Sequence, residues 1–243
     1  MVTEQLKELW HLAFGDGEDA IDAFFCTAYT PERCLYLTEQ GQITAALYWL
    51  DCEYQGQKQA YLYAVATHPD HRGKGLCRRL METAHSQLKN QGYHAALLRP
   101  ADNGLRQMYR KLGYRTATCV SEFDCAAGDA LSLRRIGTAE YAGLRRQLLP
   151  ENGVLQEGVS LDYLSSYCEL YAGPDFILAG FPDQGRFHGV ELLGNPGSAP
   201  GILAALGYAE GSFRCPGGEI PFGMFLPLAE DAREPGYLGL AFD

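Results

Sequence analysis

The stretch RGKG, residues 72–75, combines positive charge with glycine directly before an apolar-periodic run, and this combination can bind an anion. Apolar side chains recur every four positions from Leu76 to Leu88, which predicts a helix that begins just after Gly75. The first turn of a helix exposes unpaired backbone N–H groups at the positive end of its dipole. Glycine lets a ligand approach the backbone closely. The sequence therefore predicts a phosphate-like ligand at this turn.

Positive charge is concentrated around this turn. Residues 68–115 contain ten cations and three acids, a local charge of +7, whereas the whole chain has a formal net charge of −10. A localised positive field in an acidic protein favours a compact anionic ligand over nucleic acid, whose binding proteins usually present a broad basic face. Solvated helix faces are the simpler interpretation for Lys89 and Arg115.

Two common phosphate-binding motifs do not fit the turn. A P-loop requires Ser or Thr directly after the lysine as a magnesium ligand, and Gly75 follows Lys74 here. A dinucleotide-binding loop requires a third glycine where Arg78 stands. A kinase or another nucleotide-binding protein is therefore ranked below other anion-binding functions.

The elements around the turn predict a mixed α/β fold. Apolar residues at helical spacing predict the helices, and apolar runs separated by glycine-containing gaps predict the strands of hairpins. The predicted order is helices at 5–14 and 18–29, a three-stranded antiparallel meander within 34–67, a helix from 76 to about 90, a strand at 93–100, a helix at 104–114 that ends at Gly113, and a strand at 115–125. The meander thus feeds a β-α-β unit, as in mixed sheets.

Two elements of this region resemble the GCN5-related N-acetyltransferase (GNAT) superfamily. The family's hallmark [QR]-x-x-G-x-[GA] follows a strand, and Arg72 and Gly75 match it, whereas Cys77 replaces the last small residue. The stretch YRKLGY, residues 109–114, resembles the family's later Y-x-K-x-G-[FY] element. The resemblance covers about residues 5–125, without the family's customary first strand. It implies a mixed sheet splayed between two central strands, with acetyl coenzyme A (acetyl-CoA) in the opening.

The resemblance implies a role for each matching residue in binding acetyl-CoA. Backbone groups of Val65, Ala66 and Thr67 would contact the pantetheine amides. Residues 72–78, called the basic turn below, would hold the pyrophosphate; they are Arg72, Gly73, Lys74, Gly75, Leu76, Cys77 and Arg78. Asn103 would either contact the coenzyme or cap the helix that follows it.

Tyr109 matches the family position that donates a proton to the leaving thiolate. A phenol suits this role because it stays protonated at working pH. The alternative is an aromatic side chain that merely packs on the core. Asp51, Glu53 and His68 lie near the expected cleft, but their spacing identifies none of them as a general base.

The resemblance implies an N-acetyltransferase that moves acetyl from acetyl-CoA to a primary amine by direct attack. The alternative is a non-catalytic acyl-CoA-binding sensor or interaction module, because no general base is identified. The expected acceptor is a small-molecule or peptide amine, and self-association into a homo-oligomer is left open.

A second module is expected after the break at residues 126–130. We expect a GNAT acetyltransferase domain over residues 1–127 and a smaller, degenerate GNAT-like α/β domain over residues 128–243. Residues 93–114 can be aligned with residues 187–208 as an internal echo. In this alignment Leu203 takes the place of Tyr109, and nothing in residues 130–180 resembles the basic turn.

The remaining composition favours a cytoplasmic protein. Eight cysteines are scattered without a C-x-x-C pair, which predicts reduced thiols and no structural metal site. The sequence has no run of eighteen apolar residues, so it predicts no membrane span. Its acidic N-terminus is unlike a secretory signal. We therefore expect no metal, no membrane and no nucleic acid as partners.

Overall fold

The computed structural model describes residues 2–242, which divide into two compact units. Unit 1 contains the chain up to Arg115 together with Met224–Glu234, and unit 2 contains Thr116–Gly223 together with the chain from Pro235. The expected boundary after residue 127 differs from this division, because the chain crosses between the units at three points. Each unit has its own mixed sheet, as the predicted fold class requires.

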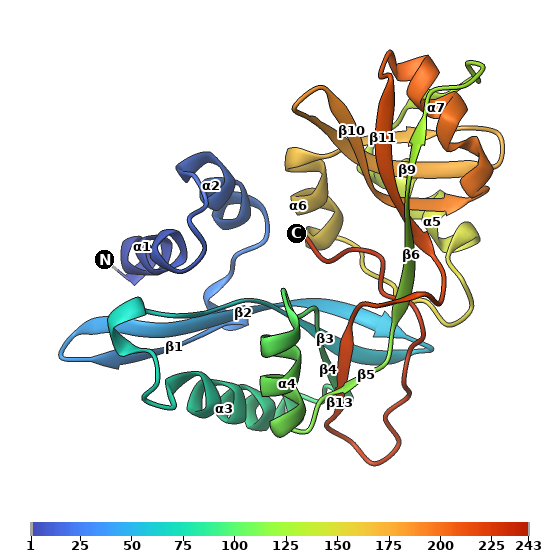
Figure 1. The fold of residues 1–243 in the computed structure, drawn as a ribbon. Coiled ribbons are helices and arrows are strands. Elements are labelled where there is room, and N and C mark those ends of the chain that lie inside the picture. The colour runs from blue at the N-terminus through green and yellow to red at the C-terminus, as the bar shows by residue number, and fades with distance from the viewer. Residues whose placement is uncertain (1, 243) are drawn as a thin grey trace. The chain divides into compact units, whose positions relative to one another are not determined.

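Unit 1 is a six-stranded mixed sheet covered by helices on both faces (Figure 1). Helices α1 and α2 cover one face, and α3 and α4 cover the other. The predicted order of elements is confirmed as far as α4. The bounds are α1 Val2–Phe14, α2 Glu18–Thr27, β1 Cys34–Glu39, β2 Gln42–Tyr54, β3 Gln57–Thr67, α3 Leu76–Asn90, β4 Ala95–Leu98, α4 Asn103–Lys111, β5 Arg115–Thr116 and β13 Met224–Pro227, with short 3₁₀ turns at Pro31–Arg33 and Pro69–His71. The sheet order is β1-β2-β3-β4-β13-β5.

Strands β3 and β4 separate after a short parallel pairing. Their register ends at Tyr61 opposite Leu97, although β3 continues to Thr67. A bulge at Ala64, which has a φ of +46°, shifts the register between β3 and β2 in the same segment. A bulge bends its strand and increases the local twist. The second half of β3 therefore leaves β4 while it stays paired with β2.

Strand β13 returns from the second half of the chain to complete the sheet of unit 1. It pairs antiparallel with β4, from Met224 opposite Leu98 to Pro227 opposite Ala95. Met224 and Phe225 are fully buried. The segment after the strand is held by side chains of β3, because Gln59 Nε2 donates to the carbonyl of Arg233 at 2.9 Å. The sequence analysis predicted no strand here.

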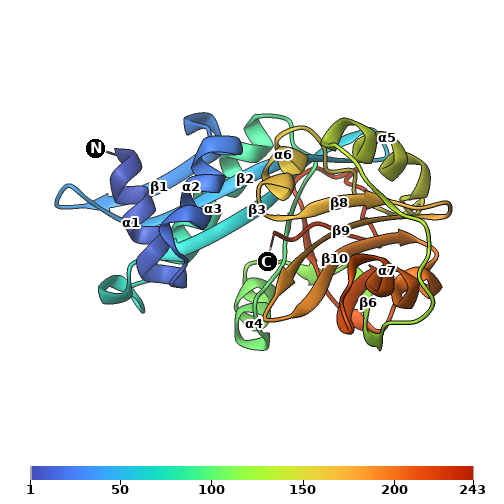
Figure 2. The same ribbon diagram turned by 90° about the horizontal axis from the view of Figure 1, so that it is seen from above.

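Unit 2 is a seven-stranded mixed sheet (Figure 2), in the order β12-β6-β11-β10-β9-β8-β7. Its elements are β6 Cys119–Ala126, β7 Arg134–Arg135, α5 Thr138–Leu148, α6 Val159–Tyr167, β8 Glu169–Ala172, β9 Phe176–Asp183, β10 Arg186–Gly194, α7 Ala199–Leu206, β11 Glu210–Pro216 and β12 Ile220–Pro221, with a 3₁₀ turn at Pro196–Ser198. The strand predicted at 115–125 is split between the sheets, because β5 belongs to the sheet of unit 1 and β6 pairs with β11.

The stretch LDYLSSYCELY, residues 161–171, predicts a single helix by its apolar pattern, but α6 ends at Tyr167 and residues 169–172 form β8. Strand β8 pairs antiparallel with β9, so sheet pairing takes precedence over the helical pattern of these residues. The stretch TAEYAGLRRQLL, residues 138–149, predicts a helix with Thr138 as its N-cap, but Thr138 is the first helical residue of α5 and Gly137 occupies the cap position.

The topology of unit 2 repeats that of unit 1, but its helices correspond to other helices than the sequence alignment of residues 93–114 with 187–208 predicts. Helix α7 joins the parallel strands β10 and β11, just as α3 joins the parallel strands β3 and β4. Both helices end in a left-handed glycine: Tyr93 N–H donates to Leu88 O at 3.0 Å, and Tyr208 N–H donates to Leu203 O at 2.9 Å. Leu203 therefore corresponds to Leu88, not to Tyr109.

Candidate active site

The basic turn presents an uncapped helix N-terminus. Gly73 and Gly75 have φ values of +78° and +76°, which disfavour residues with a Cβ. Gly75 is the N-cap of α3, and the first helical bond runs from Arg79 N–H to Gly75 O at 3.1 Å. Among residues 2–242, no side chain caps the helix and no atom beyond the adjoining residues lies within 4 Å of a Cβ built at either glycine. The first backbone N–H groups of α3 thus face open space that a phosphate can enter.

The cations at the turn are available to a ligand. Arg72, Lys74, Arg78 and Arg79 are exposed, and within residues 2–242 none of them forms an ion pair with a carboxylate. The Glu39 carboxylate instead lies 3.0 Å from His71 Nδ1. Unpaired cations at the positive end of a helix dipole attract anions strongly. The arrangement therefore supports the predicted anion site.

The end of β3 leads directly into the turn. Ala66 and Thr67 pair with Ala46 and Ala45 of β2, and this part of β3 lies beyond its pairing with β4. Arg72 Nε donates to the carbonyl of Thr67 at 3.4 Å, so this side chain folds back over the end of the strand. An extended ligand with amide groups can add to such an open strand edge while its anionic end reaches the turn.

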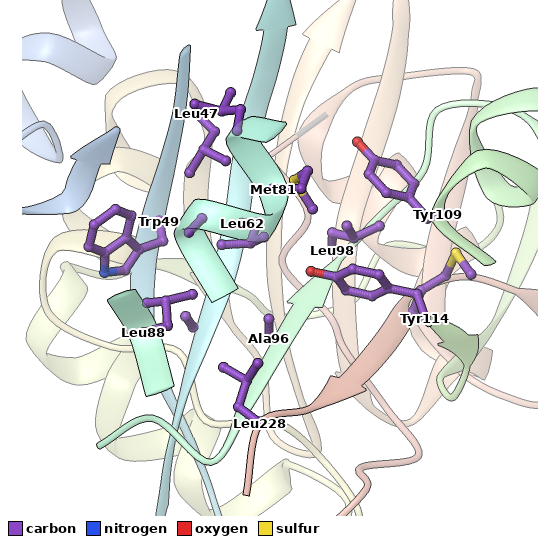
Figure 3. Close-up of a cluster of buried hydrophobic side chains, with 14 of the residues drawn as sticks. Leu47, Trp49, Leu62, Met81, Leu88, Ala96, Leu98, Tyr109, Tyr114 and Leu228 are labelled. Atoms are coloured by element: carbon purple, nitrogen blue, oxygen red, sulfur yellow. The ribbon is translucent and has the colours of Figure 1, made fainter. Parts of the chain in front are cut away.

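Tyr109 lies on the same face of the sheet as α3 (Figure 3). Its side chain is 6% exposed, and its ring contacts Tyr114 edge-to-face at 5.8 Å. Burial raises the pKa of the Tyr109 phenol, and the nearby Cys77 thiol adds to this shift. No side chain or backbone group among residues 2–242 bonds its hydroxyl. The phenol therefore stays protonated with its proton uncommitted.

The sequence analysis missed a hydrogen-bonded pair, Tyr114 and His85, in which Tyr114 is buried and His85 is partly buried. His85 Nε2 lies 2.8 Å from the Tyr114 hydroxyl, and the Tyr114 side chain is 2% exposed. Burial lowers the pKa of His85 to about 4. The signal in the sequence is weak, because a single histidine on a helix is usually an ordinary core or surface residue.

The depressed pKa of His85 predicts a specific loss of stability in acid. The unfolded pKa is about 6.5, so between pH 6.5 and 4 the unfolded chain binds more protons than the folded one. The contribution of His85 to the free energy of unfolding therefore keeps its full value above pH 6.5. It decreases as the pH falls to 4, by up to about 3 kcal/mol before solvent screening. Urea denaturation at a series of pH values measures it. His85→Gln should flatten the stability profile in this window, and an unchanged slope would contradict the assignment.

Asp102, rather than Asn103, caps α4. Its Oδ1 accepts from the backbone N–H of Leu105 at 2.7 Å, whereas Asn103 is the exposed first residue of the helix. The capping alternative for Asn103 is therefore wrong, and its contact with the coenzyme stays a prediction.

The three acid–base candidates are differently engaged. Asp51 pairs with Arg33 at 2.9 Å and also accepts from the Tyr93 hydroxyl. Glu53 is exposed opposite Lys58 in the β2–β3 hairpin. The remaining candidate, His68, uses Nδ1 to accept from the Asp70 N–H. The geometry singles out none of them as a base.

Residues 2–242 contain neither a candidate metal site nor a candidate membrane-spanning helix. Within that range no three His, Cys, Asp or Glu side chains are grouped to hold a metal ion. None of the helices there has the length and hydrophobicity needed to cross a bilayer.

Comparisons with known proteins agree with this geometry. Residues 2–117 match the family model of an acetyltransferase (GNAT) domain. Over these residues the chain is similar to GNAT acetyltransferases. The family match is an acyltransferase domain, and it includes the basic turn and Tyr109. No curated protein sequence matches the chain.

Solved structures extend the likeness of fold over most of the chain. A GCN5-related N-acetyltransferase from Kribbella flavida is 16% identical, with a TM-score of 0.70 over 95% of this chain and 70% of that one. A putative acetyltransferase from Pyrococcus horikoshii is 12% identical, with a TM-score of 0.67 over 98% and 92%. A tandem GNAT protein from the clavulanic acid biosynthesis pathway is 12% identical, with a TM-score of 0.59 over 94% and 95%. The predicted GNAT fold followed by a second GNAT-like module is thus confirmed.

The loop of unit 2 that corresponds to the basic turn of the GNAT domain is closed by a carboxylate. Asn195 Nδ2 donates to Asp175 at 2.8 Å, and the Asn195 N–H donates to the Asp175 carbonyl at 3.0 Å. A Cβ at Gly194 would lie 2.1 Å from that carbonyl oxygen. Residues 194–201 contain no cation. This loop is therefore unsuited to a phosphate.

Proposed function

We propose that unit 1 is an N-acetyltransferase that moves acetyl from acetyl-CoA to a primary amine. The observation that carries the proposal is the open edge of β3 leading into the uncapped, cationic N-terminus of α3, within a GNAT family domain. The residues fit this co-substrate, because the glycines of the basic turn leave open space where its phosphates would lie.

The roles of the residues follow from their places. Backbone N–H groups and cations of the basic turn bind the pyrophosphate, and Val65, Ala66 and Thr67 offer backbone groups to the pantetheine arm. Asn103, exposed at the start of α4, is proposed to contact the coenzyme. Acetyl-CoA supplies a thioester whose carbonyl carbon accepts the amine nitrogen.

Tyr109 completes the reaction. A bond forms between the amine nitrogen and the carbonyl carbon, the carbon–sulfur bond breaks, and the phenol gives its proton to the departing sulfur. The protonated amide product then loses its extra proton to solvent or to a base, and the phenolate regains a proton. The raised pKa of Tyr109 keeps it in the acid form before the step.

Unit 2 is proposed as a degenerate GNAT-like module, because Asp175 hydrogen-bonds Asn195 in the loop equivalent to the basic turn. We infer a cytoplasmic protein from its eight free cysteines, since reduced thiols persist there. The proposed acceptor is a small-molecule or peptide amine.

Release of free thiol from acetyl-CoA, measured with a panel of small primary amines and peptides, tests this function. Thiol release that depends on an amine supports transfer. Binding of acetyl-CoA without thiol release for any amine would favour the alternative, a non-catalytic acyl-CoA-binding module.

A further inference from the structure

We propose that His85 is a positioning residue, which acts through Tyr114 to hold the Tyr109 phenol in place relative to the basic turn. This inference rests on the proposed function, in which Tyr109 is the acid. His85 lies outside the two motifs that identify the family, and Tyr114 is the last residue of the second motif, with no role assigned to its hydroxyl.

The first contact joins α3 to the residue that follows α4. The hydroxyl of Tyr114 lies 2.8 Å from His85 Nε2. Burial raises the pKa of Tyr114 and lowers that of His85 to about 4, so both are neutral near pH 7. Two neutral groups at this distance share one hydrogen bond, and the His85 tautomer decides which of them donates.

The second contact joins Tyr114 to Tyr109 in two ways. The Tyr114 N–H donates to the Tyr109 carbonyl at 3.1 Å, across the turn at Gly113, whose φ is +93°. The two rings meet edge-to-face at 5.8 Å with an interplanar angle of 65°. Figure 3 shows the two phenols side by side over the sheet. A displacement of the Tyr114 ring therefore reaches the Tyr109 ring directly.

The His85–Tyr114 hydrogen bond links the basic turn to Tyr109. These two parts of the proposed site must both reach the same coenzyme molecule, so their spacing matters. Helix α3 begins at the basic turn and carries His85, and α4 carries Tyr109. Both helices bury their apolar side chains in one cluster, but apolar contacts are not directional. A buried polar pair adds little net stability over an apolar pair of the same shape, yet it fixes orientation. Misplacement of a reacting group by about 1 Å costs roughly 100-fold in rate.

Three single variants test the inference. His85→Leu and Tyr114→Phe each remove one partner of the hydrogen bond, and His85→Gln keeps an amide that can donate or accept near the place of Nε2. We expect His85→Leu and Tyr114→Phe to lower kcat by about 10- to 100-fold, with the KM for acetyl-CoA changed by less than about threefold. His85→Gln should recover most of the lost kcat. Circular dichroism and thermal melting confirm that each variant is folded.

A double-variant cycle separates positioning from simple loss of stability. In the Tyr109→Phe background no acid remains to be positioned, so adding Tyr114→Phe should lower kcat by less than about twofold further. Its effect on the melting temperature should persist in both backgrounds.

The outcomes distinguish this inference from the proposed function. If Tyr109→Phe lowers kcat but folded His85→Leu and Tyr114→Phe keep the wild-type kcat, the positioning inference is overturned and the acid stands. The same holds if the effects of Tyr109→Phe and Tyr114→Phe multiply fully in the double variant. If Tyr109→Phe itself keeps the wild-type kcat, Tyr109 is not the acid, and both fall.

Discussion

Tyr109→Phe is expected to lower kcat by at least about 100-fold while leaving the Kd for acetyl-CoA within about twofold. The substitution removes only the hydroxyl, whose proton has no other partner among the described residues. The ring stays packed against Tyr114. Steady-state kinetics give kcat, and calorimetric titration with acetyl-CoA gives Kd.

Tyr48→Phe is the matched control for this variant. Tyr48 is also a buried tyrosine of unit 1, 2% exposed, and its hydroxyl has no hydrogen-bond partner within residues 2–242. The same chemical change there should leave kcat unchanged and stability equal or slightly higher. Equal losses in both variants would show that a general disturbance of unit 1, rather than a missing acid, lowers the rate.

A fragment that ends at Ala127 is expected to be insoluble or molten and to lose acetyl transfer. It lacks β13, so β4 loses one of its two partner strands, and the buried side chains of Met224 and Phe225 are lost from unit 1. Loss of two buried large side chains costs about 5–9 kcal/mol, comparable with the whole stability of a domain. The fragment also carries β6 without its partner β11. Thermal melting and dye binding measure the outcome.

A second fragment restores the missing strand. Ala117 N–H donates to Gly223 O at 3.1 Å, so residues 2–117 and 223–234 can be joined there by a short Gly-Ser linker. This linked fragment should unfold cooperatively and bind acetyl-CoA. A soluble, fully active fragment of residues 1–127 would contradict the role of β13.

The basic turn could be predicted from sequence because its signals are local. Glycines, cations and a helical repeat lie within a few consecutive residues, and each has a direct physical consequence for an anion. The hairpins of unit 1 were equally visible, since Gly-containing gaps separate their apolar runs.

The exchange of strands between the two halves could not be predicted in the same way. Strand β13 has four residues, too few to show a period, and its partner β4 lies more than a hundred residues earlier. Pairing of this kind depends on tertiary packing rather than on local propensity.

The sequence alignment of the two halves pairs α7 with α4, whereas the topology pairs α7 with α3, the preceding helix. Leu-Gly-Tyr at 112–114 matches 206–208 in letters, whereas the topology matches Gly207 with Gly92. A glycine at a helix C-terminus is common, so it identifies a helix end but not which helix.

The central claim is that the basic turn binds acetyl-CoA, and calorimetric titration of Gly75→Glu against Gly92→Glu tests it most directly. Both glycines lie at ends of α3 with φ values of +76° and +79° and open space around them, so strain and added charge are matched. Only Gly75 lies where the phosphates are proposed to bind. Wild type and Gly92→Glu should bind one acetyl-CoA with similar Kd, and Gly75→Glu should bind at least about 100-fold more weakly, about 2.8 kcal/mol. A folded Gly75→Glu protein with wild-type affinity would contradict the account.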